Sequence, residues 1–129
     1  MKAYSIGLYE KAMPNTLTWK EKLEAAKEAG YDFVEISIDE TDAKLARLDW
    51  SKEERLELVK TMYEVGLPIR SMCLSGHRKY PLGSSDPVTE ARSLEIMEKA
   101  IQLADDLGVR IIQLAGYDVY YDESTPETV

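Results

Sequence analysis

The sequence of 129 residues has only one cysteine, one histidine and one phenylalanine. A single cysteine, Cys73, excludes an internal disulfide and is typical of proteins in a reducing compartment, so we expect a cytoplasmic location. A single histidine, His77, excludes a metal cage built from several histidines of this chain. Scarcity of these residues therefore removes disulfide scaffolds and multi-histidine metal centres from consideration.

Basic side chains are also in the minority, with 16 against 24 acidic ones, which gives a net charge of −8. Nucleic acids and anionic membranes need basic surfaces, so we expect neither as a partner. No apolar run reaches 18 residues, which predicts the absence of a transmembrane helix. The first residues, MKAYSIGLYEKAMP, lack the apolar core of a signal peptide and are interpreted as a first strand.

Three glycines mark a repeated pattern. Gly30, Gly66 and Gly108 each follow an amphipathic stretch and precede an apolar run, and they are 36 and 42 residues apart. This order is typical of a helix end, a glycine beyond the last turn and a buried strand. A spacing of this size predicts a series of βα units. Strands are expected at residues 4–9, 33–38, 69–74 and 110–115.

Capping signals predict where the helices begin. Thr18 with Glu21, and Ser51 with Glu54, have capping-box spacing, and Asp86-Pro87 is a cap followed by a first-turn proline. A short helical segment is expected at residues 42–48. The predicted core-facing residues are Leu23 and Ala26 in the first helix, Leu56, Val59, Met62 and Tyr63 in the second, and Leu94, Met97, Ile101, Ala104 and Leu107 in the third.

The last residues repeat the capping signal. Ser124 and Glu127 have capping-box spacing, and Pro126 suits a first helical turn. We therefore expect residues 1–129 to form a single partial domain of four βα units with a truncated fourth helix.

Four βα units could belong to a doubly wound sheet or to half of a barrel. Each predicted strand alternates between an apolar face and a face with polar groups, as in Phe33-Val-Glu-Ile-Ser-Ile38. A doubly wound sheet is covered by helices on both faces and should be apolar on both. The pattern favours an α/β fold that is the N-terminal half of a (β/α)8 TIM barrel, with four parallel strands and three to four helices.

Glu35 is the most informative candidate for chemistry. A carboxylate inside a strand and on the face away from the helices is costly to bury unless it is paired. It could bind a sugar hydroxyl or take part in proton transfer, because perturbed carboxylates of this kind often belong to sites. The alternatives are a structural carboxylate whose charge is paired or hydrogen-bonded within the fold, or a carboxylate that is exposed because its strand lies at the edge of the sheet.

The loop after the third strand carries three consecutive basic-type residues, His77, Arg78 and Lys79. In an acidic protein such a group predicts an anion site, most simply for a phosphate or a polyol. We assign the ligand role to His77 and Arg78, and interpret Lys79 as a solvated side chain. The spacing of Gly76 and Gly83 matches neither a Walker A loop nor a Rossmann loop.

Strand ends supply further candidates by position. Tyr9 and Glu10 end the first strand, and Gln113, Gly116 and Tyr117 follow the fourth. Barrels place their sites at such ends, although residues there also cap and pack. The predicted substrate-binding set is Glu35, His77, Arg78, Gln113, Tyr9 and Tyr117, with no catalytic residue and no metal ligand assigned within this chain.

Several uncommon strings together resemble one family: GLYEKAMP, GYDFVEISIDETD, RLDWS, SMCLSGHRKYPLGS, SLEIMEKAIQLADDLG and IIQLAGYDVYY. They are similar to the L-xylulose/L-ribulose 5-phosphate 3-epimerases of ascorbate utilisation, also called hexulose-6-phosphate isomerases, which are xylose-isomerase-like barrels. Family members are a little over twice this length, so the resemblance implies that this chain matches only their N-terminal half.

The resemblance implies epimerisation at carbon 3 of a ketose phosphate through an enediolate, with carboxylates moving the proton and a divalent metal stabilising the intermediate. It places the metal ligands in later strands, so we expect no cofactor in this chain and little activity from it alone. Two other readings stay open. One is an aldose-ketose or hexulose-phosphate isomerase of the same superfamily. The other is a non-catalytic half-barrel that forms a homodimer through its open edges.

Overall fold

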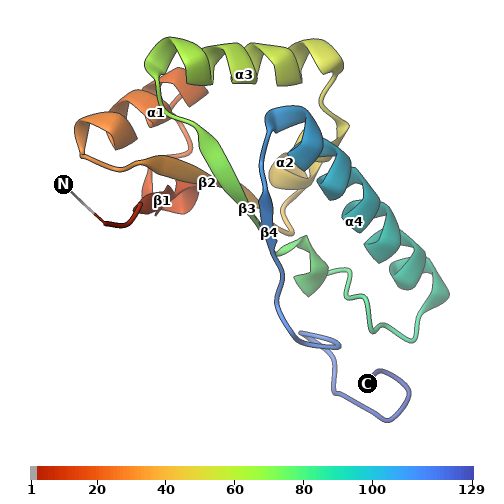
Figure 1. Ribbon diagram of the computed structural model, residues 1–129. Coiled ribbons are helices and arrows are strands. Elements are labelled where there is room, and N and C mark those ends of the chain that lie inside the picture. Colours follow the sequence, from red (N-terminus) through yellow and green to blue (C-terminus); the bar gives the residue numbers. More distant parts are fainter. Residues whose placement is uncertain (1–2) are drawn as a thin grey trace.

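A parallel sheet organises the protein, whose computed structural model describes residues 3–129. Its four strands lie in chain order, as Figure 1 shows, and every neighbouring pair is parallel. The predicted four parallel strands are confirmed, although the first and last are shorter than the predicted 4–9 and 110–115. The strands are β1 (Gly7–Tyr9), β2 (Phe33–Ile38), β3 (Ile69–Leu74) and β4 (Ile111–Gln113).

Three long helices connect the strands and lie on the same side of the sheet (Figure 1): α1 (Trp19–Glu28), α3 (Lys52–Val65) and α4 (Pro87–Leu107). Shorter turns occupy the loops at the carboxyl ends of the strands: η1 (Glu10–Ala12), α2 (Asp42–Leu45), η2 (Ala46–Asp49) and η3 (Gly76–Arg78). Within the described residues, no helix combines the length and the apolar character that crossing a membrane requires.

The capping signals act largely as predicted. Thr18 and Glu21 form a complete capping box, because each side chain accepts a hydrogen bond from the other residue's amide, at 3.2 and 2.9 Å. Ser51 accepts from the Glu54 amide and Asp86 from the Thr89 amide. All three repeat glycines have positive φ, between 75° and 92°, so a side chain there would strain the backbone.

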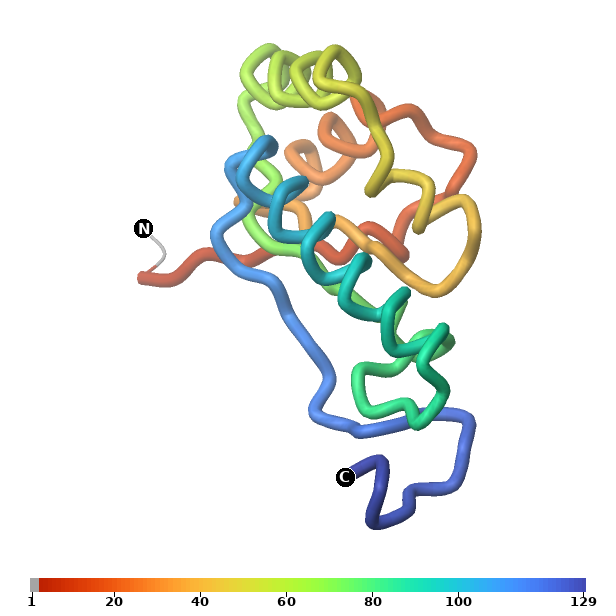
Figure 2. The backbone as a smooth tube through the Cα atoms, turned by 90° about the vertical axis from the view of Figure 1, so that its right-hand side faces the viewer, coloured from red at the N-terminus to blue at the C-terminus, as the bar shows by residue number. Residues whose placement is uncertain are grey.

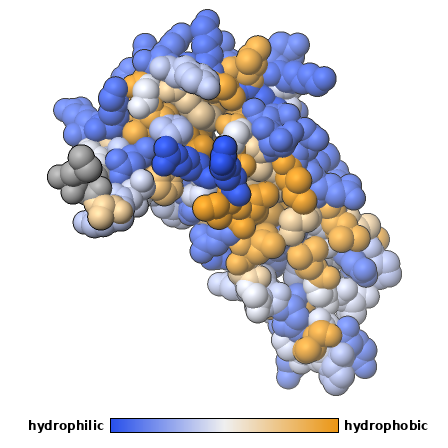
Figure 3. Space-filling model, in the orientation of Figure 1, coloured by the Kyte–Doolittle hydropathy of each residue, from blue (hydrophilic) through white to orange (hydrophobic). Residues whose placement is uncertain are grey.

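The core lies between the helices and one face of the sheet. Val34, Ile36 and Ile38 of β2 are fully buried there, as are Leu23 and Ala26 of α1, which confirms the predicted stripe of the first helix. Within residues 3–129 the other face of the sheet carries no helix, and its residues are more exposed toward β4 (Figure 3 shows hydrophobic side chains gathered along that strand). One apolar face and one open polar face agree with a half-barrel.

The predicted stripes of the two later helices are partly wrong. Leu56 and Tyr63 on α3 are 68% and 84% exposed, and Leu94 and Ile101 on α4 are 52% and 55% exposed. Each helix has apolar residues on two opposite faces, so helical periodicity alone could not decide which face meets the sheet. The buried residues are Arg55, Leu58, Met62 and Val65 on α3, and Ser93, Ile96, Ala100, Leu103, Ala104 and Leu107 on α4.

The segment after β4, residues 114–129, contains neither helix nor strand. It turns back beside the loop that precedes α4 (Figure 2), where the Gly83 amide donates to the Asp118 carbonyl at 3.0 Å. The helix predicted to begin at Ser124 is not formed. Instead, the Ser124 hydroxyl donates to the Asp118 carboxylate at 2.8 Å, and Thr128 donates to the same carboxylate.

Candidate functional site

The open face of the sheet is lined by a patch of polar side chains. In the strand register, Tyr9 is opposite Glu35 and Glu35 is opposite Ser71, which places these three in one row across β1, β2 and β3. A second row, one step nearer the carboxyl ends, contains Ser37, Cys73 and Gln113. Because alternate residues of a strand share a face, both rows lie on the side away from the helices.

Two hydrogen bonds hold this patch together. The Ser71 hydroxyl donates to Glu35 Oε2 at 2.7 Å, which gives the half-buried carboxylate a partner and leaves its other oxygen available. The Tyr9 hydroxyl donates to Ser37 Oγ at 3.1 Å. Burial, together with the neighbouring Cys73 thiol and the Glu35 charge, raises the pKa of Tyr9 to about 12 despite the Ser37 bond, so the phenol stays protonated at neutral pH.

Gln113 lies at the carboxyl end of β4, in the same row as Cys73 of β3. Its side chain is exposed, and it ends a strand at the open edge of the sheet. Three of the six predicted site residues, Tyr9, Glu35 and Gln113, therefore share one face of the sheet.

His77 lies in η3, directly beyond β3, but its ring is only 6% exposed. Its Nε2 is 3.0 Å from the Ser93 carbonyl oxygen in the first half of α4. This contact ties the loop to the helix, which is the geometry of a positioning residue.

Arg78 and Tyr117 meet at the rim beyond the carboxyl ends of the strands. The Arg78 guanidinium carbon is 5.1 Å from the centre of the Tyr120 ring, and Tyr117 packs on Tyr120 with ring centres 5.2 Å apart. Burial raises the pKa of Tyr117, although the charge of Arg78 and a hydrogen bond to it act in the opposite direction. The Tyr121 hydroxyl donates to Glu40, which joins this rim to the loop after β2.

The largest charged cluster surrounds Glu10, which is fully buried directly after β1. Its Oε2 is 2.7 Å from Lys22 Nζ and 3.1 Å from Lys44 Nζ, and Arg47 donates to both oxygens at 2.6 Å. The Ser37 amide donates to Oε1 at 2.8 Å. Burial alone would raise the pKa of Glu10, but Arg47, then Lys22 and the amide, outweigh it and lower the pKa to about 2.

Sequence reasoning identified Glu10 by position but missed its three cations. Lys22, Lys44 and Arg47 are 12, 34 and 37 residues away along the chain, so no local spacing could reveal them. Trp19 and Trp50 flank the cluster: Arg47 lies 5.2 Å from the centre of one ring and 5.7 Å from the other.

A polar hollow of about 590 Å³ adjoins this cluster over the carboxyl ends of β1 and β2. Lys11 crosses it to form a 2.8 Å ion pair with Asp39, whose carboxylate also accepts from the Thr41 amide and hydroxyl. The Lys11 charge and these bonds lower the pKa of Asp39, although burial would raise it. The hollow is lined by Lys11, Met13, Asn15, Asp39, Thr41, Ala43, Lys44 and Arg47.

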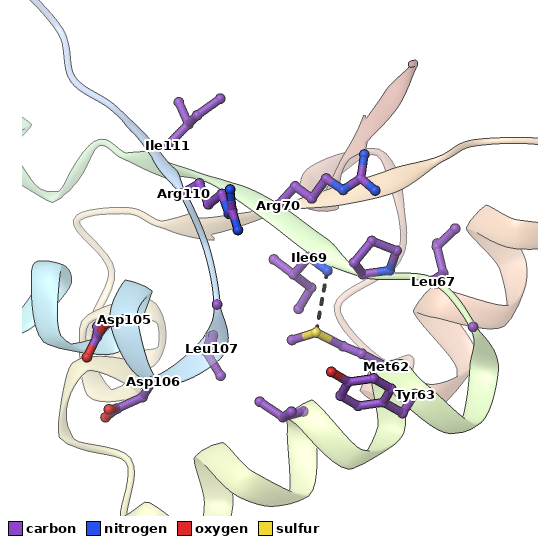
Figure 4. A pocket seen from close by; sticks show the side chains of 14 residues that line it. Met62, Tyr63, Leu67, Ile69, Arg70, Asp105, Asp106, Leu107, Arg110 and Ile111 are labelled. Carbon is purple, nitrogen blue, oxygen red and sulfur yellow. Dashed lines mark hydrogen bonds between the residues drawn. The ribbon is translucent and has the colours of Figure 1, made fainter. Parts of the chain in front are cut away.

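A larger hollow of about 870 Å³ lies at the opposite end of the strands, between the carboxyl ends of α3 and α4. Figure 4 shows Met62 and Tyr63 on one side of it, Asp105 and Asp106 on the other, and the Ile69 amide donating to the Met62 sulfur. Barrels of this type place their chemistry at the carboxyl ends of the strands, so the smaller polar hollow is the better candidate for a substrate.

Among residues 3–129, no group of three or more His, Cys, Asp or Glu side chains is placed to hold a metal ion. Residues 3–129 therefore do not fit the divalent metal that the resemblance implies.

Comparison with protein families matches residues 23–129 to the model described as the xylose isomerase-like TIM barrel. Among curated relatives, L-ribulose-5-phosphate 3-epimerase UlaE of Salmonella paratyphi B is 58% identical over 127 residues, which cover 98% of this chain and 45% of the relative. The same protein of Salmonella dublin matches equally well. The chain thus spans about half the length of the curated relatives it matches.

Solved structures show the same fold at lower identity. D-allulose 3-epimerase from Methylomonas sp. superposes with a TM-score of 0.70 at 19% identity, over 96% of this chain and 42% of that one. An L-ribulose 3-epimerase superposes with a TM-score of 0.65 at 24% identity, over 95% and 40%. The predicted half-barrel and the resemblance to 3-epimerases are both confirmed.

Proposed function

Because the chain belongs to the xylose isomerase-like TIM barrel family, we propose that it supplies the substrate-binding half of a sugar-phosphate 3-epimerase. The reaction would interconvert L-ribulose 5-phosphate and L-xylulose 5-phosphate. The observation that carries this proposal is the 58% identity to L-ribulose-5-phosphate 3-epimerase across 98% of the chain. The resemblance to the enzymes of ascorbate utilisation extends the proposal to that pathway, in the cytoplasm.

The polar face of the sheet is suited to a sugar. Glu35 has one carboxylate oxygen held by Ser71, and we assign the other to a substrate hydroxyl. Tyr9 stays protonated at neutral pH, and Gln113 offers both a donor and an acceptor at the edge of the same face. Together these side chains can distinguish hydroxyl positions by hydrogen bonding, which is a strong basis for sugar specificity.

The rim residues would complete this half of the site. We assign to Arg78 and Tyr117 the contacts with the outer part of the sugar, since both lie beyond the carboxyl ends of the strands. His77 would act by position, because its bond to the Ser93 carbonyl fixes the loop that presents Arg78.

Epimerisation at carbon 3 removes a proton next to the carbonyl group and returns it to the opposite face. This half contributes orientation of the substrate, which aligns the carbon–hydrogen bond with its base. A divalent metal that stabilises the enediolate remains part of the proposal for the whole enzyme. Its ligands would be residues other than those described here.

A chimera tests the proposal. In it, this chain replaces the matched 45% of the Salmonella paratyphi B relative, and the product is assayed for interconversion of the two pentulose phosphates. We expect turnover within about tenfold of the parent, because the substrate contacts would be retained. A chimera that melts cooperatively yet shows no epimerisation would contradict the proposal. Turnover of aldose phosphates alone would favour the isomerase alternative.

Self-association is a second candidate role, and exposed apolar residues at the open edge favour it. Ile111 in the edge strand β4 is 63% exposed, and Leu114 directly after the strand is 48% exposed. Unpaired edges of this kind invite pairing between copies. Sedimentation equilibrium at micromolar concentration tests it: a dimer supports pairing through the edges, and a monomer removes it.

A further inference from the structure

We propose that the larger hollow, at the amino ends of β3 and β4, is a second binding site whose ligand is an amphipathic monocarboxylate. Such a molecule has an apolar chain and a single carboxylate. The hollow lies at the opposite end of the strands from the polar face that we assign to the sugar. The inference therefore goes beyond the proposed function and does not depend on it.

The walls of the hollow are preformed and largely apolar. Its volume of about 870 Å³ falls within the range of roughly 300–1,000 Å³ that is usual for sites of small organic molecules. Met62, Ile69 and Leu107 are buried in its wall, where α3, β3 and α4 meet. The Ile69 amide donates to the Met62 sulfur at 3.5 Å, which joins the strand to the helix (Figure 4). An apolar chain can thus enter without a rearrangement of the fold.

Two exposed hydrophobic side chains border the hollow from different elements. Tyr63 of α3 is 84% exposed, and Ile111 of β4 is 63% exposed. Single exposed hydrophobic residues are common on protein surfaces, but these two line the same hollow. A ligand that covers both removes their apolar surface from water, which favours binding. The apolar chain of the ligand is therefore assigned to the space between them.

Two arginines supply the charge for the carboxylate. Arg70 in β3 and Arg110 directly before β4 are neighbours across the sheet, because the Arg110 amide donates to the Arg70 carbonyl at 3.2 Å. Both are exposed and line the hollow, and within residues 3–129 neither forms an ion pair. Guanidinium groups bind carboxylates through two parallel hydrogen bonds. The fold thus leaves a pair of carboxylate-binding groups without an anion of its own.

The charges around the hollow match one negative charge rather than two. Asp106 is already paired with Arg55 at 2.7 Å. Asp105 also lines the hollow, so Arg70 and Arg110 share it with one further carboxylate, and one positive charge remains in excess. A monocarboxylate neutralises this excess, whereas a phosphate monoester, with a charge of roughly −1.5 to −2, would exceed it.

The helix ends at the hollow do not require a cation, although the carboxyl end of a helix carries partial negative charge. At the end of α3 the Val65 carbonyl accepts from the Lys27 ammonium at 2.7 Å. At the end of α4 the Asp105 carbonyl accepts from the Gly108 amide at 3.2 Å. Because the chain itself satisfies these carbonyls, the arginines are the groups that bind the charge of a ligand.

The test uses the 129-residue chain and octanoate as the probe, followed through amide chemical shifts. We expect saturable shifts at residues 62–70 and 105–111. Acetate lacks the apolar chain and 1-octanol lacks the charge, so each should bind about tenfold more weakly or worse. Octanoate shifts that do not saturate, or that centre on other residues, would overturn the proposal. Equal affinities for octanoate and octanol would overturn it as well, because the arginines would then contribute nothing.

Substitutions separate the charged contact from the apolar one. Arg70→Gln and Arg110→Gln should each weaken octanoate binding about tenfold, because each removes a charge-assisted hydrogen bond, and should leave octanol binding unchanged. Tyr63→Ala should weaken both ligands. Arg92→Gln is the matched control, since it removes an arginine of α4 that pairs with Glu95 and does not line the hollow.

Both site arginines are exposed, so the variants should melt as the wild type does, and thermal unfolding checks this. Octanoate affinity that is unchanged in Arg70→Gln and in Arg110→Gln would overturn the site. A loss in Arg92→Gln as large as in these two variants would also overturn it, because binding would then follow the net charge of the chain and not the hollow.

Discussion

Glu10 is the residue on which the carboxyl end of the sheet depends most. Glu10 directly follows β1, and its carboxylate contacts α1, α2, η2 and the β2 backbone through Lys22, Lys44, Arg47 and the Ser37 amide. A charge at such a depth is tolerated because every one of these groups donates to it. The cluster therefore fixes the geometry of two loops at once.

Glu10→Gln keeps the size of the side chain and removes its charge. Three buried or nearly buried cations would then lack a counter-ion, and we expect the free energy of unfolding to fall by about 3–5 kcal/mol. Urea denaturation at neutral pH measures this loss. The matched control is Glu95→Gln on the surface of α4, where the ion pairs with Arg92 and Lys99 are exposed and a much smaller loss is expected. Equal losses in both variants would contradict the assignment.

The pKa of Glu10 predicts a pH dependence of stability. Its folded-state pKa of about 2 lies below the ordinary value of 4.5, so the carboxylate stabilises the fold above about pH 4.5. As the pH falls from about 4.5 toward 2, we expect this residue's contribution of about 3 kcal/mol to disappear. The difference in unfolding free energy between the wild type and Glu10→Gln, followed over this range, isolates it. A difference that stays constant with pH would contradict the prediction.

Among single residues, the sequence predicted the polar side chains on the open face of the sheet but not the charged cluster around Glu10. Alternation along β2 and β1 was enough to place Glu35 and Tyr9 on the open face, because a strand has only two faces. Neither the contact of His77 with Ser93 nor the three cations on Glu10 could be predicted, since both depend on how distant elements pack.

Among the elements, helix ends were predicted well and helix faces poorly. Capping depends on neighbouring residues, so Thr18 and Ser51 could be identified from spacing alone. The core-facing side of α4 could not, because apolar residues occupy both the stripe with Ile96 and Leu103 and the opposite stripe with Leu94 and Ile101. Tertiary packing decides between two such stripes.

Two truncations on α4 test this assignment of faces. Leu103→Ala removes a fully buried side chain and is expected to lower the free energy of unfolding by about 2–5 kcal/mol. Ile101→Ala removes a side chain that is 55% exposed, and a change within about 0.5 kcal/mol is expected. Urea denaturation of both variants gives the comparison. A larger loss for Ile101→Ala would show that the helix presents its other face to the sheet.

For the whole molecule, the alternation of apolar and polar faces was enough to predict a barrel-type sheet from the sequence. The structure and the family comparison agree with that prediction. The segment after β4 was not predicted, because its contacts with Gly83 and Asp118 form between loops that have no repeating pattern. What the molecule presents is a polar surface on the open face of the sheet, where Tyr9, Glu35 and Gln113 lie.

The central claim is that this polar surface, and not the larger hollow between α3 and α4, receives the sugar phosphate. The most direct measurement is the titration of the 129-residue chain with L-ribulose 5-phosphate, observed through amide chemical shifts. We predict saturable shifts at Tyr9, Glu35 and Gln113. Shifts confined to Tyr63, Arg70 and Asp105 around the larger hollow, or no saturable shift at all, would contradict the account.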